Sequence, residues 1–271
     1  MALLRRHIVA VFFTLTYLIS WGCWFGAAAL RQPLGGFVGL IAATGAFGPT
    51  IAGFVCTGIA SGREGIAHLL RRIVAWRVSW KAYLAAIFVP FLLAFLPLVL
   101  FSYFGGPSIY VENLSRLPML IPFFLTMLIA GGLNEEPGWR GFALPVLRSR
   151  HGSLVASLLI GIFWGTWHVP LYMLGAPILI ASLIGFVVLT TIISVLFTAL
   201  ANYTHDNVWI AIVFHAAYNT FIPNLPGLFN VPRFPQHQMI AVLMVVVMVF
   251  AVLWWWRREP IEPLTTLEFG K

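Results

Sequence analysis

The sequence predicts an all-α membrane protein, a polytopic bundle of about eight transmembrane helices with one further amphipathic helix at the membrane interface. Three observations predict this class. Hydrophobic residues make up 61% of the 271 positions and charged residues only 9%, against roughly 45–50% and about 25% in an ordinary soluble domain. The apolar residues gather into runs of about 20, the length of a helix that crosses a bilayer. The basic residues are also unevenly divided between the loops on the two sides.

The apolar runs define eight predicted spans within one transmembrane domain, residues 1–271. They cover residues 7–30, 35–60, 82–104, 117–147, 153–174, 178–200, 207–223 and 238–256. The first run is longer than a signal-peptide core of about 7 to 15 residues, so we expect it to be retained as a helix. The fourth is longer than a bilayer needs and is expected to tilt or break. Pro137 and Gly138 are the expected break, because proline removes a helix donor.

The loops predict the orientation of the bundle, because Lys and Arg accumulate on the cytoplasmic side of short membrane loops. With the N-terminus inside, the outer side receives only Arg31, Arg116 and Arg233. The inner side receives the other thirteen of the sixteen basic residues: Arg5, Arg6, Arg63, Arg71, Arg72, Arg77, Lys81, Arg140, Arg148, Arg150, Arg257, Arg258 and Lys271. We therefore expect an integral protein of a bacterial-type plasma membrane with both termini cytoplasmic. Membrane lipids are expected partners, and the net charge of +8 requires no nucleic acid.

A mixed segment lies between the second and third spans. Its apolar and basic residues alternate at helical spacing: Ile66, Leu69, Leu70 and Ile73 with Arg63, Arg71, Arg72 and Arg77. This pattern is typical of an amphipathic helix in the inner interface. Contact with lipid is the favoured interpretation, and substrate docking is the alternative. The run at 253–260 is predicted as an aromatic belt with basic anchors.

Very few ionisable residues fall at membrane depth. Only Glu135 and Glu136 of the eight acids lie inside an apolar run, and only His168 and His215 of the seven histidines lie well inside one. An ionised group near the bilayer centre costs roughly 2.5 to 3.5 kcal/mol on insertion scales, so such residues are normally paired, face a polar cavity and have a function.

Spacing separates the two glutamates. Glu136 and Arg140 are four residues apart, so on a helix they share a face and can form an ion pair. Glu135 is rotated by about 100° from Glu136 and is left without that partner. This inference assumes that the chain stays roughly helical through Pro137 and Gly138.

The histidines lie on two further helices. His215 and Asn219 are four apart and should project together. At 1.5 Å per residue, Glu135, His168 and His215 lie about 19, 22 and 12 Å from the inner surface, which is compatible with one buried polar cavity. Such a cavity could hydrolyse a peptide. A buried carboxylate and an imidazole can activate water, and a second imidazole with a carboxamide can stabilise an oxyanion.

Three motifs resemble those of one family. "NEEPGWRGFALP" is similar to the EExxxR motif of the CAAX-processing and bacteriocin-immunity (CPBP, or ABI) intramembrane proteases, which include the eukaryotic CAAX prenyl endopeptidase. "FWGTWHVPLY" resembles their FxxxH motif and "HAAYN" their HxxxN motif, in the same order and on separate helices. The strong resemblance covers a catalytic core of about residues 117–223. "FGPTIAG" at 47–53 is similar in kind.

The resemblance implies roles for six residues. Glu135 would be the general base that activates water, assisted by His168. His215 and Asn219 would stabilise the oxyanion, and Glu136 with Arg140 would support the site. The sequence departs from the FxxxH pattern at Trp164, beside Phe163, where an aromatic ring should still flank the site.

The family implies a metal-independent glutamate mechanism, so no cofactor is expected. Zinc is the disfavoured alternative, because glutamate and histidine bind zinc but the chain has no HExxH sequence. The expected activity is an endopeptidase acting near the inner leaflet on a peptide or a lipid-modified protein. The alternatives are a proton-coupled transporter, for which the expected repeat is missing, and a catalytically silent immunity or scaffold member of the family.

Overall fold

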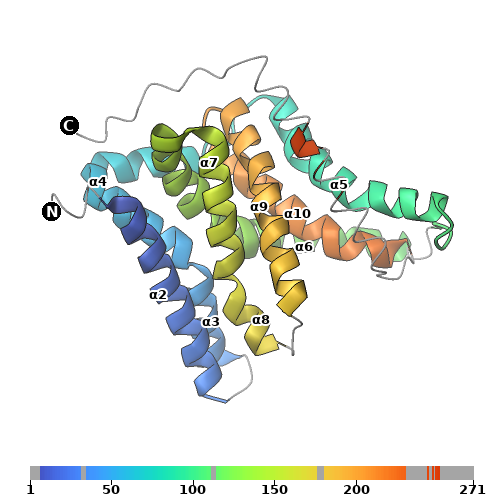
Figure 1. The fold of residues 1–271 in the computed structure, drawn as a ribbon, viewed down its shortest axis with the longest axis horizontal. Coiled ribbons are helices and arrows are strands. Elements are labelled where there is room, and N and C mark those ends of the chain that lie inside the picture. The colour runs from blue at the N-terminus through green and yellow to red at the C-terminus, as the bar shows by residue number, and fades with distance from the viewer. Residues whose placement is uncertain are drawn as a thin grey trace.

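A computed structural model describes residues 7–31, 35–110, 114–175 and 180–229, together with 243, 246 and 248–250. Every regular element in these ranges is a helix (Figure 1), which confirms the all-α class. Six of the helices are long and apolar enough to cross a membrane, or seven if one bent pair counts as a span. The protein is therefore an integral membrane protein with approximately the predicted number of spans. Most of the predicted span 238–256 and the anchor run 253–260 lie outside the described residues.

The first predicted span is present as α2 (Ile8–Ala29), but the second is not one helix. It consists of α3 (Gly36–Ala46) and α4 (Gly48–Ile73), which meet at an angle of 52°. Pro49 lies in the first turn of α4, where its missing N–H leaves no bond unmade. The predicted span over 35–60 is therefore present as a bent pair of helices, which together are apolar enough to count as one span.

The predicted amphipathic helix is the last part of α4. Gly62 has φ 61 and ψ −152, a conformation open mainly to glycine, and it separates this part from the part that begins at Gly48. Leu69 and Ile73 are buried against Val208 and Ile212 of α10. The helix therefore packs one apolar stripe against the protein, while Leu70 on another face is 47% exposed; contact of the exposed face with lipid stays a prediction.

The predicted fourth and fifth spans are joined end to end and contain two π-helices. The segments are η1 (Leu114–Met119), α6 (Leu120–Met127), η2 (Leu128–Leu133), η3 (Pro137–Ala143), α7 (Leu144–Trp167) and α8 (Val169–Gly175). The helix is interrupted at the Asn134–Glu135 turn, just before the predicted position at Pro137. A second break, at Gly152 with φ 76 and ψ 168, separates the two predicted spans.

The remaining helices enclose this segment. They are α5 (Trp80–Tyr103), α9 (Ile180–Tyr203) and α10 (Val208–Leu228). α7 packs against α9, and α10 packs against α5, α6 and η2, while η3 lies on α4. Figure 1 shows α2, α3 and α4 on one side of the molecule and α5, α6 and α10 on the other, with α7 and α9 between them. The segment η2–η3 is thus contacted from both sides.

η3 lies unusually close to α4. A Cβ atom on Gly138 would overlap the carbonyl group of Pro49, and one on Gly53 would lie 2.9 Å from the Cα atom of Gly138. Only glycine at 138 allows this contact, so the acidic motif rests directly on the start of α4.

Candidate active site

The two acidic residues lie where the two π-helices meet. The N–H of Asn134 donates to the carbonyl of Ile129 at 3.2 Å, a five-residue step that widens the helix. Such π-turns are rare and occur often at functional sites. Pro137 begins η3, a position where its missing N–H is tolerated. Glu135 and Glu136 consequently lie in the protein interior, 4% and 0% exposed.

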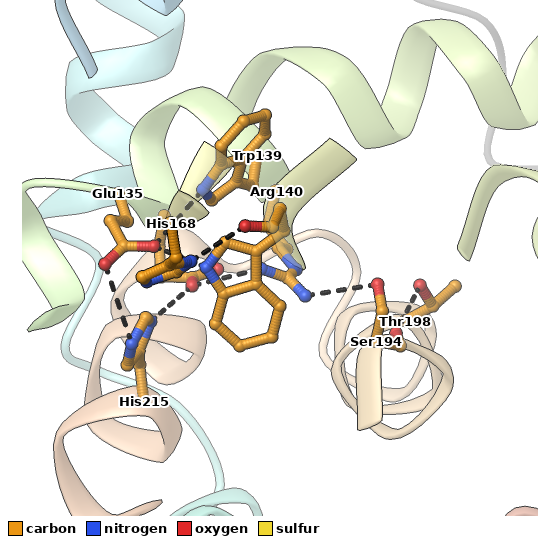
Figure 2. Close-up of polar contacts among 9 residues, drawn as sticks. Glu135, Trp139, Arg140, His168, Ser194, Thr198 and His215 are labelled. Carbon is orange, nitrogen blue, oxygen red and sulfur yellow. Dashed lines mark hydrogen bonds and ion pairs between the residues drawn. The ribbon is translucent and has the colours of Figure 1, made fainter. Parts of the chain in front are cut away.

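The predicted ion pair is present and buried. Arg140 Nη1 lies 3.1 Å from Glu136 Oε1, and the two side chains are 1% and 0% exposed. The guanidinium also donates to Ser194 Oγ at 3.3 Å and stands 3.9 Å from the ring centroid of Phe197. α9 therefore completes the surroundings of the arginine (Figure 2). Spacing along the sequence correctly predicted which glutamate is paired.

His215 connects the two glutamates. Its Nδ1 atom lies 2.7 Å from Glu136 Oε1, and its Nε2 atom lies 3.9 Å from Glu135 Oε1, as Figure 2 shows for Glu135. Because the ionised, arginine-paired Glu136 can only accept, Nδ1 of His215 is the donor. The other ring nitrogen therefore faces Glu135 and the site.

Glu135 has no arginine partner in the described part of the chain, as the spacing predicts, but its carboxylate is not free. Its Oε2 atom accepts hydrogen bonds from Nε1 of Trp164 at 2.6 Å and Nε1 of Trp139 at 3.3 Å. Its Oε1 atom is the one that faces His215. The two oxygens of this carboxylate therefore have different surroundings.

His168 caps the C-terminus of α7. Its Nδ1 atom lies 2.8 Å from the carbonyl oxygen of Trp164. A carbonyl can only accept, so Nδ1 carries the proton and Nε2 of the neutral ring is an acceptor. Within the described part of the chain, His168 makes no hydrogen bond to Glu135. The structure places it in the same group of side chains (Figure 2) without direct contact.

α2 supports the end of α7 that carries His168. The Tyr17 hydroxyl donates to the carbonyl of Phe163 at 2.8 Å, and Trp21 Nε1 donates to the carbonyl of Trp167 at 3.0 Å. Neither residue was among the candidates from the sequence, because nothing in their local pattern relates them to a helix nearly 150 positions away.

Asn219 lies one turn beyond His215 on α10 and is partly exposed. Among the described residues its carboxamide has no hydrogen-bond partner. A Cβ atom on Gly131 would lie 2.5 Å from Asn219 Nδ2 and 3.4 Å from His215 Cδ2. The backbone of Gly131 therefore forms the wall beside Asn219 and His215, a role that the sequence did not reveal.

The arrangement of donors bears on metal binding. In the described ranges, no group of three or more His, Cys, Asp or Glu side chains is placed so that it could hold a metal ion. His215 and His168 each use one ring nitrogen in a hydrogen bond within the protein. A mechanism without a cofactor stays a prediction.

Two prolines leave carbonyls without helical donors, and α4 supplies the missing donors. An α-helix would bond the carbonyl of Leu133 to residue 137 and that of Gly141 to residue 145, but both positions are proline. Thr50 Oγ1 donates to the Leu133 carbonyl at 2.9 Å. Arg72 Nη1 donates to the Gly141 carbonyl at 2.8 Å.

Arg72 makes two further hydrogen bonds from the amphipathic part of α4. They go to the carbonyls of Arg140 at 3.2 Å and Asp206 at 2.8 Å. The sequence places Arg72 only on a basic helix face, since its three carbonyl partners are distant along the chain. It anchors η3 and the loop before α10 to the interfacial helix.

Comparison with known proteins agrees with the motifs. Residues 117–221 match the family model described as type II CAAX prenyl endopeptidase Rce1-like. CAAX prenyl protease 2 of Methanococcus maripaludis is 28% identical to the chain over 167 residues, which cover 59% of the chain and 61% of that protein. The chain thus spans less than two thirds of this relative's length. Over residues 117–221, which contain all three motifs, the comparisons confirm the predicted resemblance to the CAAX-processing endopeptidases.

Proposed function

We propose that this protein is an intramembrane endopeptidase of the CAAX-protease type, in which Glu135 activates water for attack on a peptide bond. The observation that supports this most directly is the pair of neighbouring glutamates in different states. Glu136 is held by Arg140 and His215, while Glu135 keeps one carboxylate oxygen towards the site. A buried carboxylate with one available oxygen is suited to general-base catalysis.

The proposed reaction has two steps. Glu135 takes a proton from water as the water oxygen bonds to the carbonyl carbon, giving a tetrahedral oxyanion. The carbon–nitrogen bond then breaks, and the proton on Glu135 passes to the leaving amine. His168, whose Nε2 is an acceptor, orients the water by accepting its second hydrogen.

The oxyanion would be stabilised by donors on α10. The carboxamide of Asn219 supplies an N–H group, and His215 would donate through Nε2, since Nδ1 is occupied by Glu136. Removing one such donor from an enzyme typically slows catalysis about 10²- to 10³-fold. Glu136 and Arg140 support the site and do not touch the reacting atoms.

The proposed substrate is a peptide or a lipid-modified protein that approaches from the inner leaflet, with both termini of the enzyme cytoplasmic. The printed name of the relative refers to a prenyl protease, so a prenylated peptide is the first substrate to try. The similarity to this protease supports a location of the enzyme in a membrane, and the excess of basic residues in the loops on one side supports the cytoplasmic placement of the termini.

The test is cleavage of quenched fluorescent peptides, with and without an isoprenyl group, by purified protein in detergent. Glu135→Ala and His168→Ala should abolish cleavage, whereas Glu64→Ala, which changes an exposed glutamate, should leave it intact. A chelator should have no effect. Cleavage that survives Glu135→Ala would contradict the mechanism. If no peptide is cleaved while Glu135 controls proton flux in liposomes, the transporter hypothesis is favoured.

A further inference from the structure

The carboxylate of Glu135 is held by two tryptophans from different helices. Trp139 lies in η3 and Trp164 in α7, and their indole N–H groups both point at Oε2 of Glu135. The two rings are 0% and 4% exposed. Buried polar groups without partners are costly. The hydrogen bonds to Oε2 therefore satisfy both buried indole N–H groups as well as the carboxylate oxygen.

We propose that Trp164 and Trp139 are positioning residues for Glu135, which hold Oε2 so that Oε1 is the oxygen that takes the proton from water. The inference rests on the proposed function. An indole N–H can only donate, so the two indoles occupy the lone pairs of Oε2 and disfavour a proton on that oxygen. The proton therefore goes to Oε1, the atom 3.9 Å from His215 Nε2.

Without these donors the carboxylate would have no preferred rotation. The terminal torsion of glutamate is broad and nearly two-fold, so sequence and backbone alone do not decide which oxygen faces the site. Two N–H groups on one oxygen remove this freedom. Trp164, at 2.6 Å, makes the shorter contact, and Trp139, at 3.3 Å, the longer one.

Trp164 also contacts the other groups of the site. Its ring lies 5.4 Å from that of His215 and 5.0 Å from the guanidinium carbon of Arg140. Its carbonyl accepts the Nδ1 hydrogen of His168. One residue therefore relates the base, both histidines and the supporting arginine. Phenylalanine at this position would keep an aromatic ring but lose the indole N–H and part of the ring volume, so the sequence departure at 164 adds a donor to the base.

Trp139 is oriented by one ring from outside the matched region and one from inside it. Its ring packs edge-on against Phe12 of α2 at 5.5 Å and against Trp167 at 6.1 Å between centroids. It is four residues from Glu135, so the same turn supplies the base and one of its donors. The N-terminal helix thus influences the base through this ring.

The first test compares two tryptophan-to-phenylalanine variants. Trp164→Phe should lower kcat about 10- to 100-fold, the size typical of losing a hydrogen bond that orients a reactive group, with KM unchanged. Trp24→Phe is the matched control, because Trp24 is equally buried and its N–H donates to the carbonyl of Ala42 at 3.0 Å, away from Glu135. It should lower thermal stability without lowering kcat. Equal kcat in the two variants would overturn the proposal.

The second test needs no cleavage. In wild-type protein with ¹⁵N-labelled tryptophan, the indole signals of Trp164 and Trp139 are assigned from the Phe variants and compared with those of Glu135→Ala. Both should shift when the acceptor is removed, and the Trp24 signal should not. If the two indole signals do not shift in Glu135→Ala, the proposal is overturned. Should Trp164→Phe fail to fold, Trp139→Phe alone serves to assign the Trp139 signal. Cleavage by Glu135→Ala would instead refute the proposed function.

Discussion

Replacing Glu136 by alanine should destabilise the protein more than replacing its neighbour Glu135. Glu136 Oε1 alone contacts Arg140 Nη1 at 3.1 Å and His215 Nδ1 at 2.7 Å. In the described residues, Glu136 Oε2 and Arg140 Nε are buried without hydrogen-bond partners. Oε1 of Glu136 therefore both neutralises the buried Arg140 and orients His215.

The magnitude follows from burial. With Glu136 0% and Arg140 1% exposed, loss of one partner leaves an uncompensated buried charge, which costs about 3–5 kcal/mol. Glu135→Ala leaves two indole N–H groups without an acceptor, at roughly 1–3 kcal/mol each, but it also removes a buried carboxylate, which offsets much of that. We expect a difference of about 2 kcal/mol or more in the free energy of unfolding, which corresponds to a difference in Tm of roughly 4–8 °C between the two variants.

The assay is thermal unfolding of both variants in the same detergent, followed by tryptophan fluorescence, together with the yield of folded protein. Glu136→Leu combined with Arg140→Met should recover much of the lost stability, because an apolar pair can replace a buried ion pair at little cost. If Glu136→Ala and Glu135→Ala unfold at the same temperature, the division of roles between the two glutamates is refuted.

Two further variants test the walls and supports of the site. Gly131→Ala should lower kcat about as much as Asn219→Ala, because the added methyl group displaces the carboxamide of Asn219. The double variant should therefore have a kcat no lower than that of either single variant. Additive losses in kcat would refute this. Arg72→Met should lower the free energy of unfolding by roughly 1–3 kcal/mol per unsatisfied buried carbonyl. The exposed neighbour variant Arg71→Met is the control and should change it little, and equal unfolding midpoints would contradict the anchoring role of Arg72.

Local spacing predicted what depends on neighbours along the chain. The all-α class and most of the spans follow from apolar runs, and the Glu136–Arg140 pair follows from a four-residue step, which the widened turns of η3 still accommodate. The depth estimate was compatible with a meeting of Glu135 and His215, whose side chains approach to 3.9 Å. Apolar runs, four-residue spacing and depth along a helix depend only on the local sequence, so they can be read from it.

The features that the sequence did not predict depend on contacts between distant helices. Next to the bend between α3 and α4, the backbone of Pro49 is in close contact with Gly138. The hydrogen bond of Trp164 to Glu135 joins residues 29 positions apart, and spacing alone treated that tryptophan as an aromatic substitute. Apolar periodicity shows which face of a helix is buried but not which partner it meets.

The match over residues 117–221 does not make that segment self-sufficient. Pro137 and Pro145 permit the wide π-helical turns that carry the acidic motif, and the same two prolines leave the carbonyls of Leu133 and Gly141 without helical donors. Thr50 and Arg72 provide these donors from α4, one from each side of the break at Gly62. Because carbonyls without partners are costly where they are shielded from water, we expect the segment with the motifs to depend for this geometry on α4, both before and after Gly62.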